Sequence, residues 1–150
     1  MQLEELIKSY LPTKNVMQLA TCANNQPYAV NLHYYSDENF NIYWSSKKDR
    51  RHSIELDGNN KACAVIKIHE NTDSEDWVIG LTIEGTVEIA HLPSAEVASS
   101  FKAKLKRSDE GMAELVSGQG ASVMYKLKPV KITIYDNKTF PDEPKRELVL

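Results

Sequence analysis

The feature that most constrains the fold is a series of strand-like runs separated by very short turns. Residues 15–23, 28–35 and 40–45 are rich in apolar, β-branched and aromatic side chains, which predicts three strands. Between them stand two turn-forming segments, Asn24-Asn25-Gln26-Pro27 and Ser36-Asp37-Glu38-Asn39. Because links this short join antiparallel neighbours, we expect the three strands to form an antiparallel meander.

The rest of the chain predicts further strands and a few short helices. Helices are expected over residues 1–12, over 50–56, from Ser94 onward and over 110–116. Strands are expected over residues 61–69, 77–90, 122–127 and 131–135, with Lys128-Pro129 separating the last two. Gly80 and Gly85 indicate a bulge or a close backbone approach, residues 70–75 an acidic loop, and residues 136–150 an irregular tail. Together these elements predict one mainly β (α+β) domain, 1–150, built on a barrel or strongly curved sheet.

Composition limits the classes of function. The 150 residues carry a net charge of -3, whereas a general nucleic-acid-binding domain would carry a basic excess. No segment approaches the roughly 20 apolar residues that a membrane span needs, and the N-terminus lacks a signal-peptide pattern. Cys22 and Cys63 both lie in strand-like surroundings, which favours two reduced thiols over a disulfide. We therefore expect a cytoplasmic protein that binds neither nucleic acid nor membrane.

Common catalytic and cofactor motifs are absent from the sequence. It contains neither the GxGxxG nor the GxxxxGK[ST] phosphate loop, and no GxSxG nucleophile elbow. The histidines show no HExxH spacing and have no partnered cysteine pair, so no metal site is expected. The sequence names no catalytic residue.

A basic cluster is the strongest candidate site. It contains hydroxyl and cationic side chains: Ser45, Ser46, Lys48, Arg50, Arg51 and His52. A helix is expected to begin in the same stretch, and its free N–H groups would add to the donors available for a phosphate. On the basic run alone, a solvated loop is the better explanation. Cations are unfavourable at a helix start, however, and several of them there make more sense if an anion joins them.

A second candidate group lies on the strand before the cluster. Asn31 and His33 share the face opposite Val30 and Leu32, because side chains alternate along a strand. A lone histidine is more often structural than functional. The pair would nevertheless suit the polar edge of a planar ligand.

Five segments in this order carry a resemblance to a known family: LATC, QPYAVNLHYY, IYWSSKKDRRHSIEL, LTIEGTVEIA and YKLKPVKITIYD. The chain resembles the pyridoxamine 5'-phosphate oxidase-like family of FMN-binding split barrels, up to about Asp136. The resemblance implies a six-stranded antiparallel split barrel that forms a homodimer with FMN at the subunit interface. By motif position it implies phosphate contacts from Ser45, Ser46, Lys48, Arg51 and His52, and a flavin ring near Asn31, Leu32 and His33.

The C-terminal tail departs from that family. Pyridoxamine phosphate oxidases proper end in an arginine-containing segment that TFPDEPKREL does not match, so vitamin B6 oxidation is not expected. We expect instead an FMN-dependent oxidoreductase that acts on another small molecule. Two alternatives stay open: a split barrel that binds haem or deazaflavin, and a cofactor-free dimeric binding or scaffold module.

Overall fold

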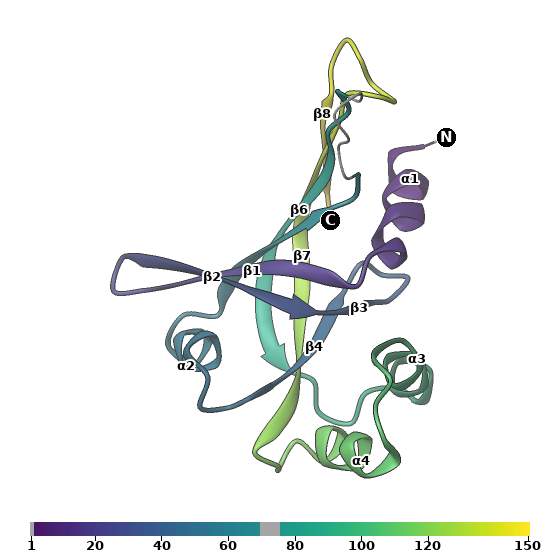
Figure 1. Ribbon diagram of the computed structural model, residues 1–150. Coiled ribbons are helices and arrows are strands. Elements are labelled where there is room, and N and C mark those ends of the chain that lie inside the picture. The colour runs from purple at the N-terminus through teal and green to yellow at the C-terminus, as the bar shows by residue number, and fades with distance from the viewer. Residues whose placement is uncertain (1, 70–75) are drawn as a thin grey trace.

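The computed structural model describes residues 2–69 and 76–150, and its centre is one antiparallel β-sheet (Figure 1). Within these residues the sheet has eight strands in the order β2-β1-β5-β6-β7-β4-β3, with β8 beside β7. The strands are β1 (Val16–Ala23), β2 (Gln26–His33), β3 (Tyr35–Ser36), β4 (Ile42–Lys47), β5 (Lys61–Lys67), β6 (Ile79–Ile89), β7 (Ser122–Asp136) and β8 (Lys145–Val149). The helices are α1 (Leu3–Tyr10), a 3-10 turn η1 (Leu11–Thr13), α2 (Arg51–Gly58), α3 (Ala95–Leu105) and α4 (Asp109–Ser117).

The sheet curls until its two ends lie together. Strand β2 stands at one end of the strand order and β3 at the other, yet only Tyr34 separates them in the sequence. Tyr34 is fully buried; its N–H donates to the Asn15 carbonyl (3.1 Å) and its hydroxyl to the Leu11 carbonyl (2.5 Å). One residue can link the two ends of a sheet only if these ends are adjacent. The expected split antiparallel barrel is therefore confirmed, and the split lies between β2 and β4.

The core fills the concave face of the curled sheet. Inward side chains alternate along the strands, as Leu81, Ile83 and Val87 do on β6. Trp44 and Tyr125 stack inside, with their ring centroids 5.7 Å apart. A second cluster forms where α3 and α4 cover the outward side chains of β4 and β7, and it includes Phe101 and Met124. The helices thus cover one part of the outer face and leave the rest open.

The first hairpin is confirmed, and the second pairing of the expected meander is wrong except at Tyr35, the last residue of the expected second strand. Asn24 and Asn25 have φ values of 51° and 61°, which two-residue hairpin turns require and asparagine tolerates. Strands β1 and β2 pair along their whole length across this turn. The third strand, β4, pairs with β7 on one side and with the short β3 on the other, and it does not pair with β2. The chain crosses the split at Tyr34, so the short link joins opposite ends of the sheet.

Strand β7 is continuous where two strands were expected. Pro129 lacks an N–H, but β4 pairs with residues 122–127 and β8 with residues 131–135, so no ladder on that side needs one. On the other side, the register with β6 shifts between Glu84 and Gly85. A Cβ at Gly85 would overlap the Lys128 carbonyl oxygen and lie 3.0 Å from the Pro129 Cα. The glycine thus marks a bulge and a close backbone approach, as the sequence predicted.

The irregular tail predicted for residues 136–150 is also wrong in part. Lys145–Val149 forms β8, which pairs with the second half of β7 and alternates between exposed and half-buried side chains. Strands β3 and β8 account for the difference between the six strands expected for the barrel and the eight of the described residues. The acidic loop expected over residues 70–75 lies outside the described residues. Among residues 2–69 and 76–150, no helix is long and apolar enough to cross a membrane.

Candidate functional site

A cavity of about 440 Å³ opens in the split between the two ends of the sheet. We call it the split cavity. Strand β2 forms one wall with Tyr28, Val30 and Leu32, and β4 forms the other with Ser45, Ser46 and Lys47. The start of α2, Arg107 and Ser122 complete the lining. Residues that lie far apart along the sheet meet here because the sheet curls.

A tight turn places the start of α2 at this cavity. After β4 the Lys48 N–H donates to the Ala121 carbonyl (3.0 Å), and the Arg50 N–H donates to the Lys47 carbonyl (3.2 Å). The Ser53 hydroxyl donates to the same Lys47 carbonyl (2.9 Å). Arg50 stands at the N-cap without a side-chain acceptor for the first turn. The helix therefore begins with uncapped amides at a cationic cavity, which favours an anion.

Cations dominate the lining of the split cavity. They are Lys47, Arg50, Arg51 and Arg107, and the lining contains no carboxylate. Arg107 follows α3, where Lys106 takes a left-handed conformation (φ 53°) that ends the helix. Its Nη2 donates to Ser45 Oγ (2.9 Å). A site with this charge balance suits an anion such as a phosphate, since cationic donors form charge-assisted hydrogen bonds.

His52 is buried beneath the cationic groups. It is 6% exposed, and its Nε2 lies 2.8 Å from Ser46 Oγ. Burial lowers the pKa of His52, and the nearby Arg50 charge lowers it further, while Glu55 acts in the opposite direction. In the neutral imidazole, Nε2 either accepts a hydrogen bond from the Ser46 hydroxyl or donates one to it, according to the tautomer. The pair holds the Ser46 hydroxyl at the wall of the cavity.

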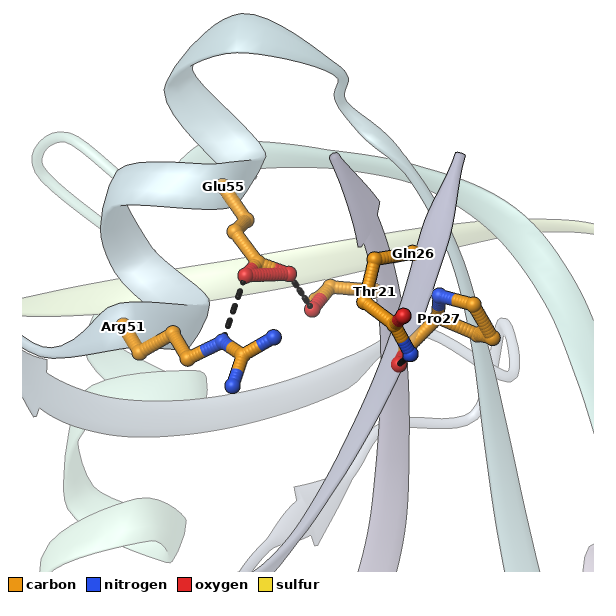
Figure 2. Close-up of polar contacts among 5 residues, drawn as sticks. All are labelled: Thr21, Gln26, Pro27, Arg51 and Glu55. Carbon is orange, nitrogen blue, oxygen red and sulfur yellow. Dashed lines mark hydrogen bonds and ion pairs between the residues drawn. The ribbon is translucent and has the colours of Figure 1, made fainter. Parts of the chain in front are cut away.

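Arg51 is fixed from two sides. Its guanidinium carbon lies 4.0 Å from the centre of the Tyr28 ring, a cation–π contact. Its Nε donates to Glu55 Oε2 (2.8 Å), and Glu55 Oε1 accepts from the Thr21 hydroxyl (3.0 Å), as Figure 2 shows. The hydrogen bond from Arg51 is the largest cause that lowers the pKa of Glu55. Within the described residues, the two terminal nitrogens of Arg51 make no hydrogen bond.

The structure brings together five of the eight residues that the sequence predicted. Leu32, Ser45, Ser46, Arg51 and His52 line the split cavity. The other three, Lys48, Asn31 and His33, do not line it and are exposed.

Alternation along β2 explains where Asn31 and His33 lie. They are on the strand face opposite Leu32, and Asn31 Oδ1 accepts from Gln18 Nε2 (2.8 Å). Sequence reasoning missed Arg107 and Tyr28 as members of the site. The only signal for Arg107 was the basic end of α3, which also suits the helix dipole.

Metal ligation has no support in the part of the chain that the structure describes. No group of three or more His, Cys, Asp or Glu side chains there could hold a metal ion. Cys22 and Cys63 are both free and half-buried. The donor set of the split cavity is therefore one of cations, hydroxyls and amides.

Comparisons with known proteins agree with the fold. The model of the pyridoxamine 5'-phosphate oxidase family matches residues 3–136. No curated protein matches the chain in a sequence search.

Solved structures share the architecture at low sequence identity. General stress protein 26 from Bacillus anthracis is 19% identical over 100% of both chains, with a TM-score of 0.68. An FAD-binding protein from Mesorhizobium loti is 18% identical, with a TM-score of 0.63, and the match covers 88% of this chain and 92% of that one. The haem storage protein HutZ from Vibrio cholerae is 19% identical, with a TM-score of 0.62, and the match covers 86% and 91%.

Proposed function

Because the chain belongs to the pyridoxamine 5'-phosphate oxidase family, we propose that it is a flavoprotein whose split cavity binds the phosphate of FMN. The observation that carries this proposal is the lining of the cavity. Four cations, three serine hydroxyls and the uncapped start of α2 converge there without a carboxylate. Each charge-assisted hydrogen bond to a phosphate contributes about 1.5–3 kcal/mol, so two or three of them would anchor a monoester.

The flavin ring would lie along β2, which forms the wall opposite the serines. Val30 and Leu32 are half-buried in this wall and would give the ring an apolar surface. FMN, when bound, would supply the redox chemistry, and the chain would supply anchoring, orientation and exclusion of water. We propose an oxidoreductase of a small molecule and assign no catalytic acid or base.

Pyridoxamine phosphate oxidation proper is not the activity that we propose. Arg146, the arginine of the C-terminal tail, lies on β8 and does not line the split cavity. Its Nη1 lies 3.7 Å from Glu143 Oε2, and its guanidinium carbon lies 4.8 Å from the centre of the Phe140 ring. The side chain is thus engaged within its own segment.

We propose a homodimer that uses the uncovered outer face of the sheet. Small and apolar side chains gather there, including Ala20, Cys63 and Val65, and Val130 is 54% exposed. Asn31 and His33 lie on the same side of β2, outside the split cavity. In a dimer joined through this face, these two residues would meet the second subunit. That arrangement would account for the predicted ring contacts that one chain does not bring to the cavity.

The absorption spectrum of the purified protein tests the proposal. We expect flavin bands, or, after removal of any ligand, saturable FMN binding with a rise in melting temperature. A mass measurement in solution should give twice the chain mass. Haem is the second candidate ligand, because a haem storage protein is among the solved structures with this fold. A Soret band in the spectrum would favour haem over FMN. A colourless protein without a thermal shift on FMN addition would contradict both cofactor assignments and support a cofactor-free dimer.

A further inference from the structure

Arg51 lies between two cavities. It lines the split cavity and also a cavity of about 720 Å³ between the β1–β2 hairpin and α2, which we call the hairpin cavity. Its side chain is 53% exposed and borders both cavities. A flexible arginine in this position has two spaces to occupy. Its contribution to binding a ligand in the split cavity depends on the contacts that orient its guanidinium group.

In the ion pair between Arg51 and Glu55, the carboxylate is the side chain held in place. Its side chain is only 9% exposed, and both of its oxygens are engaged, one with Arg51 and the other with Thr21. Thr21 is 3% exposed and belongs to β1, so the carboxylate connects α2 to the sheet. Figure 2 shows the carboxylate of Glu55 between the guanidinium group and the threonine. This arrangement differs from an ordinary surface pair such as Lys8–Glu4, in which both side chains are exposed.

The geometry of the contact leaves the binding end of Arg51 free. Glu55 accepts from Nε, and Tyr28 covers one face of the guanidinium plane. The two terminal nitrogens have no hydrogen-bond partner within the described residues. A guanidinium fork binds phosphate best through paired N–H groups whose plane is already set. An anchored arginine also loses less rotamer entropy when it binds a ligand.

We propose that Glu55 and Thr21 are positioning residues that hold Arg51 at the split cavity, ready for the phosphate of the ligand. The inference rests on the proposed function for the identity of the ligand. Without the anchor, the guanidinium group turns toward the hairpin cavity and solvent. Glu55 and Thr21 do not touch the phosphate themselves; they set its affinity through Arg51.

The test compares FMN with riboflavin, which lacks the phosphate. We expect Glu55→Ala and Thr21→Val each to weaken FMN binding about 5- to 20-fold and to leave riboflavin binding unchanged. Thr21→Ser keeps the hydroxyl and should retain wild-type affinity. Glu4→Ala removes the exposed i,i+4 pair of α1 and serves as the matched control. In an Arg51→Ala background, Glu55→Ala should weaken FMN binding no further.

Equal losses for FMN and riboflavin, or a further loss in the Arg51→Ala background, would overturn the positioning role. A second readout needs no flavin: the ¹⁵N signal of the Arg51 Nε–H in the full chain. We expect slow exchange of this proton in the wild type and in Thr21→Ser, and fast exchange in Glu55→Ala and Thr21→Val. Fast exchange in the wild type would overturn the inference. Slow exchange in a protein that binds no FMN would refute the proposed ligand alone.

Discussion

Nε2 of His52 lies 2.8 Å from Oγ of Ser46, and this contact ties the end of β4 to the first turn of α2. The two residues are six apart in the sequence, and the turn between them brings a buried ring under an accessible hydroxyl. Because Ser46, His52 and Arg51 line one cavity, their substitutions should act on the same ligand.

The double variant Arg51→Ala, His52→Ala should bind FMN at least about 10-fold more weakly, because it loses one cationic donor and the partner of Ser46. Fluorescence titration with FMN measures the change. Lys8→Ala removes an exposed cation of α1 outside the split cavity and is the control. The mass in solution should be that of the wild type for both variants. Unchanged FMN affinity in the double variant would remove these residues from the site.

Variants of Arg107 and Lys48 distinguish the site defined by the cavity lining from the site implied by motif position. Arg107 lines the split cavity and donates to Ser45, whereas Lys48 does not line it. We expect Arg107→Ala to weaken FMN binding about 10-fold, as the loss of a charge-assisted contact does, and Lys48→Ala to change it less than about 2-fold. Isothermal titration of both variants gives the comparison. The opposite order would favour the motif assignment over the cavity.

The pH dependence of stability should report His52. Burial lowers its pKa in the folded chain, whereas the unfolded chain has the ordinary value of about 6.5. Below that value the unfolded state binds more protons, so the free energy of unfolding falls as the pH falls toward the lowered folded-state pKa. We expect the urea midpoint of the wild type to fall more steeply below about pH 6.5 than that of His52→Gln. Parallel curves for the two proteins would contradict a buried neutral His52.

Alanine substitutions at Gly85 and Gly58 test the close backbone approach at the bulge, with Gly58 as the control. A Cβ at Gly85 would overlap the Lys128 carbonyl, whereas nothing lies within 4 Å of a Cβ at Gly58. We expect Gly85→Ala to lower the free energy of unfolding by about 2–4 kcal/mol, because two backbones must separate. Gly58→Ala should change it by less than about 0.5 kcal/mol. Chemical denaturation measures both, and equal effects would contradict the close approach.

Local signals predicted the elements whose causes are local. Asn24-Asn25 adopts the positive φ values of a hairpin turn, and Ser94 caps α3 by accepting from the Val97 N–H (3.1 Å). Ser45, Ser46 and His52 could be grouped because one short segment contains them all. In each case a few neighbouring residues determine the geometry.

Long-range pairings were not predictable from those signals. Residues 42–47 pair with residues 122–127, and nothing near either segment specifies the other. For the same reason the sequence did not place Arg107 beside Ser45. Pro129 suggested a break in the strand because proline cannot donate a backbone hydrogen bond. The strand accommodates it because β4 ends its pairing before Pro129 and β8 begins its pairing after it, and the local sequence shows neither partner. Lys145–Val149 has three charged residues followed by two apolar ones, so its sequence does not alternate, and β8 forms through its long-range pairing with β7.

The exchange of partners along β7 has a consequence for how such a chain can diverge. Its first half pairs with β4, which contributes Ser45 and Ser46, and its second half pairs with β8. In Figure 1 these two regions lie at opposite ends of the long strand. Changes in the last ten residues therefore alter one end of the molecule without moving the serine-bearing wall of the split cavity at the other. Descendants of such a chain can acquire new C-terminal segments while they inherit the same split cavity.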